Sequence, residues 1–214
     1  LVAETNKPVL KAQVGYSRIT ETGKAVGFSA SGDSITNAEG EFRLLGVMPG
    51  KYKLMPIMYQ GGEYYGEPIT VEVGDEDLSG LELKMEPGSL ITGVAVPEDP
   101  NNADAVRKLA KIALFVTFSG NEDLLGPLNQ SPIGANGDFQ IKGVRPGKAN
   151  LRLSNYEPEN RGFSITRIER DGVPVREGLE VKAGEPVTGL RVTIGYGSGL
   201  IRGEVKYEGG SLPD

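Results

Sequence analysis

Apolar and polar residues alternate along two short stretches of the chain that are separated by a glycine and a Pro-Gly pair. Phe42 and Leu44 alternate with charged residues, and Tyr52 and Leu54 alternate with lysines. Alternation with a period of two predicts β-strands with one buried face. The Pro-Gly pair at 49–50 suits a type II turn, in which proline fixes φ and glycine accepts the positive φ that follows. The pattern predicts an antiparallel pair of strands.

The same pattern recurs 97 positions further along the chain. Residues 40–51 read GEFRLLGVMPGK and residues 137–148 read GDFQIKGVRPGK, with seven of the twelve positions identical. Such self-similarity is typical of repeated modules, and it argues against a single enzyme body. A glycine-rich loop binds phosphate when a helix follows it, but strand-like residues follow both loops. We therefore expect Phe42 and Phe139 to be core anchors, each stabilising its module by about 1.5–3 kcal/mol.

A second repeated pattern marks the end of each unit. The sequence GLEL at 80–83 precedes a turn and the strand pattern LITG at 90–93, and GLRV at 189–192 similarly precedes LIRG at 200–203. The second occurrence would begin a third copy, and we expect the first copy to lack its opening strand. We predict three units in a piece of a longer array, with a short connection near 86–89 and a semi-rigid, elongated shape: 1–86 (repeat 1), 87–195 (repeat 2) and 196–214 (the first strand of repeat 3).

These motifs resemble a known family. The pattern T-x-x-x-G-E-F-x-L-x-G-V-x-P-G-K-Y-x-L at 36–54 resembles the carboxypeptidase regulatory-like domain, and the stretches 168–175 and 189–205 are similar to repeats of long bacterial surface proteins. The resemblance implies an all-β fold of tandem seven-stranded, prealbumin-like (transthyretin/Ig-like) β-sandwiches. It also implies a secreted, cell-surface or periplasmic location and a non-catalytic role as a spacer or interaction module. The alternatives are a carbohydrate-binding module, because starch-binding-like domains share the wider fold group, and an accessory domain attached to an enzyme or outer-membrane receptor.

The related collagen-adhesin B-type domain forms a Lys–Asn isopeptide bond assisted by a buried glutamate. The resemblance places that glutamate shortly after the Tyr-x-Leu strand. The nearest candidate in the second repeat is Glu157, which stands beside Pro158. Because this departs from the motif, we do not expect a cross-link.

Composition narrows the functional classes further. The net charge is −6, with 29 acidic and 23 basic residues and no basic run, which argues against nucleic acid and anionic membranes as partners. The chain contains no histidine and no cysteine, so the commonest general base, thiol nucleophiles and thiolate metal sites are all missing. No stretch of 18 apolar residues occurs that would span a membrane. We predict no catalytic residues, no metal site and no cofactor.

Two acidic stretches and one helix-forming stretch need separate interpretation. The acidic residues at 75–77 are expected to form a solvated loop. The segment 98–104 carries more oxygen ligands, and calcium takes six to eight of these, so calcium binding there stays an open alternative. A helical turn is expected at 104–109, a strand at 111–118 because of its β-prone residues, and a long loop at 121–132.

Three tyrosines are the candidates for a binding site. Tyr59, Tyr64 and Tyr65 cluster around the sequence QGGE at 60–63. Exposed aromatic rings beside amides and carboxylates bind sugars or proteins, whereas a hairpin with a Gly-Gly turn would pack alternate rings into the core. Because Tyr64 and Tyr65 are adjacent, one of them must face outward on a strand. The expected partners are other repeats of the same array, with a polysaccharide or a cell-surface protein as further candidates.

Overall fold

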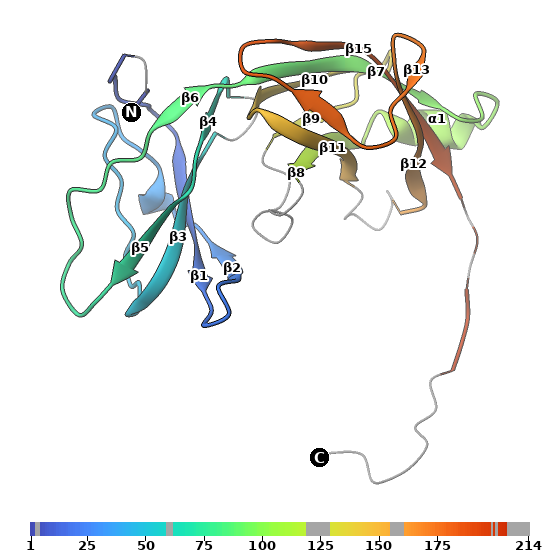
Figure 1. Ribbon diagram of the computed structural model, residues 1–214. Coiled ribbons are helices and arrows are strands. Elements are labelled where there is room, and N and C mark those ends of the chain that lie inside the picture. Colours follow the sequence, from blue (N-terminus) through green and yellow to red (C-terminus); the bar gives the residue numbers. More distant parts are fainter. Residues whose placement is uncertain are drawn as a thin grey trace.

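The computed structural model of the chain describes residues 1–2, 5–58, 62–118, 129–154, 161–197, 199 and 201–204. The described residues form four β-sheets, one short α-helix and one 3-10 turn (Figure 1). Two sheets are built from residues 13–87, and the other two from residues 89–196. The all-β fold predicted from the alternating pattern is therefore confirmed.

The first part of the chain contains one four-stranded antiparallel sheet, in which the strand order is β2-β1-β3-β5. The predicted strand after the Pro-Gly pair is β3, and its Tyr52 and Leu54 are buried as expected. A separate two-stranded sheet pairs β4 with β6. The elements are β1 (Gln13–Ile19), β2 (Ala25–Ser29), η1 (Gly32–Ser34), β3 (Gly50–Ile57), β4 (Tyr64–Gly66), β5 (Ile69–Val73) and β6 (Met85–Pro87).

The second part of the chain contains two larger sheets, of five and four strands. The five-stranded sheet has the order β10-β7-β15-β12-β13, and the four-stranded sheet has the order β14-β11-β8-β9. The elements are β7 (Ser89–Pro97), α1 (Ala103–Leu109), β8 (Ala113–Phe118), β9 (Gln130–Pro132), β10 (Asp138–Val144), β11 (Gly147–Ser154), β12 (Phe163–Arg170), β13 (Val173–Pro174), β14 (Leu179–Val181) and β15 (Val187–Tyr196). The predicted arrangement of seven strands in each unit is thus not confirmed.

The two four-stranded sheets correspond strand for strand. The order β2-β1-β3-β5 matches β9-β8-β11-β14. The register matches too, since Gly50 pairs with Val73 in the first sheet and Gly147 pairs with Val181 in the second. The glycine that ends the Phe-containing segment has φ 68° at Gly46 and 66° at Gly143. The repeated sequence therefore produces the same local backbone and the same sheet in both parts of the chain.

The opposite sheets do not correspond, and one prediction is wrong. Phe139 and Ile141 lie on β10 and are buried, but Phe42 and Leu44 are only half-buried and residues 41–49 form no strand. A strand requires a neighbour for its backbone hydrogen bonds. The neighbour of β10 is β7, and the described residues before β1 contain no corresponding strand.

The helix-forming stretch behaves as predicted. It forms α1, which the Asn102 side chain caps by accepting a hydrogen bond from the N–H of Ala105, and β8 follows it. Most of the predicted loop at 121–132 lies outside the described residues, although β9 occupies residues 130–132. Asp171 and Gly172 connect β12 to β13 with φ values of 50° and 80°, as a tight two-residue hairpin requires.

The buried apolar residues divide along the same line as the sheets. The large cluster of the second part packs between its two sheets and includes Ile91, Phe139, Ile141 and Val192. The first part has two smaller clusters, one around Tyr52 and Leu54 and the other around Val2, Val9, Ala12 and Met85. No apolar cluster mixes described residues from both parts. We call residues 1–86 the first unit and residues 87–195 the second unit, and this division stays a proposal.

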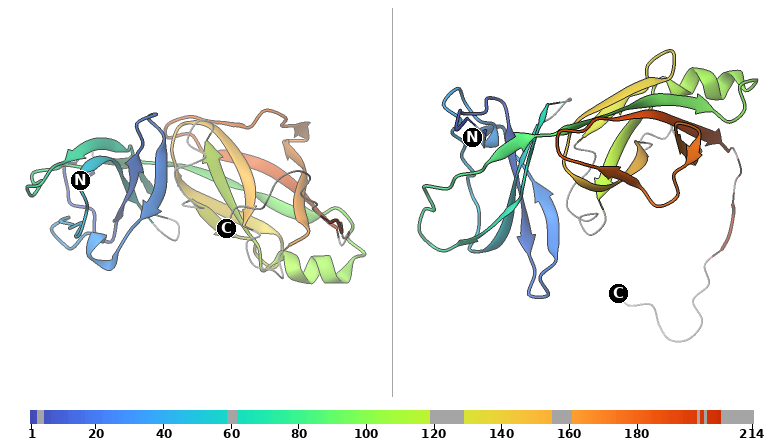
Figure 2. Two further views of the ribbon diagram at one scale, coloured as in Figure 1. Left: turned by 90° about the horizontal axis from the view of Figure 1, so that it is seen from below. Right: turned by 45° about the horizontal axis from the view of Figure 1, so that its top comes forward.

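The connection between the two units is very short. Gly88 alone separates β6 from β7, and Figure 2 shows these strands as an almost continuous ribbon between the two groups of sheets.

Within the described residues, no helix is long and apolar enough to span a bilayer.

The difference between the two phenylalanines can be measured. Phe139→Ala removes a side chain that is 3% exposed, and we expect it to lower the free energy of unfolding by about 3–5 kcal/mol. Phe42→Ala should cost clearly less, because the half-buried ring leaves a smaller cavity. Urea denaturation followed by circular dichroism measures both. Equal losses for the two variants would contradict the structure.

Candidate functional site

A groove lies on the side of the first unit. Its walls are residues 40–47 and 74–81, and its volume is about 810 Å³. Its floor is the inner face of the four-stranded sheet: Tyr52, Leu54, Val71 and Val73. A smaller pocket of about 130 Å³ adjoins it, because Gly40, Phe42 and Leu81 line both. We refer to the two together as the groove.

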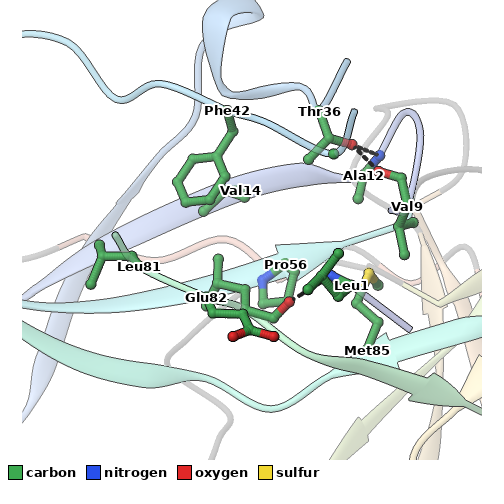
Figure 3. A pocket seen from close by; sticks show the side chains of 12 residues that line it. Leu1, Val9, Ala12, Val14, Thr36, Phe42, Pro56, Leu81, Glu82 and Met85 are labelled. Carbon is green, nitrogen blue, oxygen red and sulfur yellow. Dashed lines mark hydrogen bonds between the residues drawn. The ribbon is translucent and has the colours of Figure 1, made fainter. Parts of the chain in front are cut away.

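Figure 3 shows how apolar side chains line the smaller part of the groove. Phe42 and Val14 lie on one side, and Leu81 and Leu1 lie on the other. Thr36 fixes the chain that leads to Phe42, since its hydroxyl donates to the carbonyl of Val9 at 2.6 Å and accepts from the N–H of Ala12 at 2.9 Å. The segment that carries Phe42 is therefore tied to the residues just before β1 even though it is not a strand.

A glycine with positive φ begins the part of the opposite wall that leads to β6. Gly80 has φ 75°, and Gly189, which begins the corresponding stretch of β15, has φ 74°. After Gly80 the chain runs through Leu81 and Leu83 without joining any described strand until β6. Leu81 is half-buried and Leu83 is 7% exposed. This wall is thus an extended segment with an apolar face toward the groove.

One end of the groove is closed by the first residues of the chain. The Leu1 ammonium donates to the carbonyl of Leu83 at 2.9 Å, and the N–H of Met85 donates to the carbonyl of Leu1 at 2.7 Å. Val2 and Met85 form a parallel bridge. The same parallel pairing joins β7 to β15 in the second unit, where Ile194 pairs with Pro97. Val2 and Met85 therefore occupy the places of Pro97 and Ile194.

The groove combines an apolar floor with unpaired backbone walls and an acidic rim. It offers an apolar floor and two backbone segments that form no β-ladder with any described residue. Its carboxylates, including Glu82 and those at 75–77, lie on the rim and are exposed. No group of three or more acidic residues among those described is placed to hold a metal ion.

Two of the three tyrosines singled out in the sequence, Tyr64 and Tyr65, lie at the junction between the two units. Tyr64 and Tyr65 are on β4, which pairs with β6 and not with β3 as the hairpin interpretation would require. Tyr64 packs against the cluster around Met85, and both tyrosines are half-buried. Tyr59 lies outside the described residues. A carbohydrate or partner site at these three residues stays a prediction.

Tyr65 has the most strongly perturbed hydroxyl among the described tyrosines. Its phenol donates to Oε2 of Glu86 at 2.7 Å. Burial, followed by the hydrogen bond to Glu86 and the negative charges of Glu86 and Glu67, raises the pKa of Tyr65 to about 12. All of these effects oppose ionisation. The phenol is thus held protonated, as a donor that ties β4 to β6.

The segment proposed as an alternative calcium site has internal partners. Oδ1 of Asp99 accepts from the N–H of Asn101, and Asp104 contacts Arg107 at 2.6 Å and Lys108 at 2.8 Å. The hydrogen bond from Lys108, aided by Arg107, lowers the pKa of Asp104. The two ion pairs of Asp104 lie within α1 and stabilise it. Glu157, the candidate for assisting a cross-link, lies outside the described residues.

Sequence analysis did not identify the groove, although its signal was present. The signal is the correspondence of residues 41–47 with 138–144 and of 80–83 with 189–192. In the second unit these stretches lie on β10 and β15, whereas in the first unit they form the walls of the groove.

Comparisons with known proteins give little further guidance. No family model matches the chain, and no curated protein is significantly similar to it. Among solved structures, the chain is similar to the minor pilin GBS52 of Streptococcus agalactiae, with a TM-score of 0.31, 11% identity and coverage of 94% of this chain and 88% of the pilin. It is also similar to a streptococcal ancillary pilin (TM-score 0.31, 13% identity, 92% and 60% coverage). Scores this low carry no argument about function.

The hydrogen bond between Tyr65 and Glu86 gives the stability of the protein a measurable pH dependence. Between pH 10, the ordinary pKa of tyrosine, and about 12, the folded protein keeps a proton that the unfolded chain loses. The contribution of Tyr65 to stability is therefore fully present below pH 10 and is lost as the pH rises toward 12. The phenolate absorbance titration of the wild type minus that of Tyr65→Phe should show a midpoint near pH 12. Glu86→Gln should move this midpoint toward 10, and a wild-type midpoint at 10 would refute the assignment.

Proposed function

We propose that the chain is a non-catalytic structural module of a secreted or cell-surface bacterial protein, in which repeated β-sandwich units are joined end to end. The observation that carries this proposal is the direct packing of the two units at a one-residue connection. Units that only needed to be tethered would tolerate a longer and more flexible linker. A short, packed junction instead fixes the direction in which the next unit continues.

The junction is held by backbone contacts. The N–H of Gly88 donates to the carbonyl of Glu63 at 2.7 Å, which links the connection to the segment before β4. A methyl group added at Gly143 on β10 would overlap the carbonyl oxygen of Gly62 and would lie 3.0 Å from that of Tyr64. Such close approach leaves little room for the units to reorient.

Charged side chains contribute less to the junction. Lys142 and Glu63 approach to 3.8 Å, but the Glu63 side chain is 76% exposed. An exposed pair of this kind is worth about 0–1 kcal/mol. The backbone contacts, rather than this ion pair, support a stiff connection.

The perturbed titratable groups also support a structural role. Tyr65 joins β4 to β6, and Asp104 and Lys108 stabilise α1 through their mutual contact. Functional sites are where unexplained pKa shifts concentrate. Here each resolved shift among the described residues has a structural partner that accounts for it.

The stiffness of the junction can be tested with a matched pair of glycine variants. Gly46 and Gly143 have nearly the same positive φ, so alanine costs each about 1–2 kcal/mol in backbone strain. An added methyl at Gly46 meets nothing within 4 Å, whereas at Gly143 it meets the backbone of the first unit. We expect Gly143→Ala to be the more destabilising variant and to change the small-angle X-ray scattering profile, which Gly46→Ala should leave as in the wild type. Indistinguishable scattering profiles would contradict the rigid junction.

Affinity electrophoresis in soluble polysaccharides separates this proposal from the carbohydrate-binding alternative. A structural module migrates at the same rate with and without each glycan. Retardation by one glycan that Tyr64→Ala or Tyr65→Ala abolishes, in a variant with the wild-type circular dichroism spectrum, would overturn the structural proposal.

A further inference from the structure

We infer that the second unit bears tension along the chain, and that the parallel pair of strands β7 and β15 is the mechanical clamp that resists it. The inference deepens the proposed structural role and rests on it, because a structural module within a chain is pulled through the residues on both sides of it. Its basis is where the chain enters and leaves the second unit, at Gly88 before β7 and at Gly197 after β15.

The chain enters and leaves the second unit on neighbouring strands. Among the described strands of this unit, β7 is the first and β15 the last, and the two are adjacent in the five-stranded sheet. They run parallel, so the start of β7 and the end of β15 lie at opposite ends of the pair. Figure 1 shows β6 leading into β7 at one end of the sheet and β15 ending at the other.

Tension along the chain therefore slides the two strands past each other. Pulling the start of β7 and the end of β15 apart moves each strand along its own axis, so the evenly spaced bonds of the parallel ladder are loaded together. Pulling the two strands apart from one end would instead break the bonds one after another. Because forced unfolding is governed by the unfolding rate, the geometry that must break several bonds at once is the more resistant.

The ladder between the two strands is long and continues beyond them. Its matched positions run from Val187 opposite Ile91 to Ile194 opposite Pro97, with one irregularity after Val187. The N–H of Glu98 then donates to the carbonyl of Ile194 at 2.9 Å. Tension on the chain is thus shared along nearly the whole length of β7.

Both loaded strands lie inside the sheet and not at its edge. β7 also pairs with β10, and β15 also pairs with β12. The inner faces of the two loaded strands carry Ile91, Ala95, Val192 and Ile194, each at most 2% exposed. Neither strand can therefore separate from the sheet without breaking two ladders and opening the core to water.

A buried serine fastens the strand at which tension enters. Ser89 is the first residue of β7 and is 4% exposed. Its hydroxyl donates to the carbonyl of Lys182 at 2.6 Å. Lys182 directly follows β14, an edge strand of the four-stranded sheet. The first loaded residue of the second unit is thus bound to a segment that leads away from the opposite sheet.

An aromatic residue fastens the strand at which tension leaves. The ring of Tyr196 packs against Phe163 of β12, with centroids 4.6 Å apart. Its hydroxyl accepts a hydrogen bond from Nζ of Lys108 on α1 at 3.2 Å. The N–H of Gly197 donates to the carbonyl of Gly162 at 2.9 Å. Both ends of the loaded path are therefore anchored to neighbouring elements.

Single-molecule pulling in two directions tests the clamp. The chain contains no cysteine, so cysteines introduced at exposed positions attach the handles to chosen residues of the full chain. Lys84→Cys with Gly199→Cys pulls along the natural path, and Lys84→Cys with Thr188→Cys pulls β7 and β15 apart from the end near the junction. All three positions are exposed, so both variants should keep the wild-type circular dichroism spectrum. At equal force, we expect the second variant to unfold at least about tenfold faster, since each ladder bond changes a rate by about two- to tenfold.

A matched pair of serine variants tests the anchor at the start of β7. Ser89→Ala and Ser131→Ala each remove a buried hydroxyl, at 4% and 5% exposure, but Ser131 lies on β9, outside the loaded pair. Both variants should lower the thermal midpoint. Only Ser89→Ala should speed unfolding along the natural path, by about two- to tenfold at equal force, whereas Ser131→Ala should unfold at the wild-type rate.

These measurements have outcomes that would refute the inference. Unfolding rates that do not depend on the direction of pulling would overturn the clamp, as would a natural path that opens more readily than the other. Equal acceleration by the two serine variants would overturn the role of Ser89. Both experiments load the second unit alone. The clamp can therefore fail while the scattering and electrophoresis results still support a stiff structural module, and the reverse outcome is equally recognisable.

Discussion

The pairing of a central strand with both of its neighbours is the constraint on which the rest of this structure depends. In the second unit, β7 pairs with β10 and β15 at once. Those two strands in turn carry fully buried residues of the core, including Ile141 and Val192. Where the described chain has no such strand, as in the first unit, the sheet is reduced to the β4–β6 pair.

The local backbone does not need that strand in order to form. Gly46 and Gly80 keep the φ values of Gly143 and Gly189, and Thr36 holds the chain before Phe42 by two hydrogen bonds. Local turn chemistry and one complete sheet thus preserve the outline of the sandwich. Without a central strand among the described residues, the walls lack a β-ladder between them and their apolar side chains are less buried. The groove and the exposed faces of its walls follow from this loss.

The same distinction explains how much the sequence could predict. The strands β3, β10 and β11, the turn glycines and the helix α1 follow from periodicity and local residue preferences, which act over a few positions. Phe42 was predicted wrongly because its motif is nearly identical to that of Phe139, and the difference lies in a partner far away in the sequence. The pairing of β4 with β6, which places Tyr64 and Tyr65 at the junction, is likewise a long-range contact that no local pattern encodes.

Hydrogen exchange of the free protein tests the central claim most directly. The account predicts that the backbone amides of residues 41–45 and 80–83 exchange much faster than those of 138–142 and 189–192, although the sequences correspond. Among the described residues, only the second pair of segments has a central strand between them. Equal protection of the corresponding segments would show that the first unit already has a complete sheet, and would contradict the account.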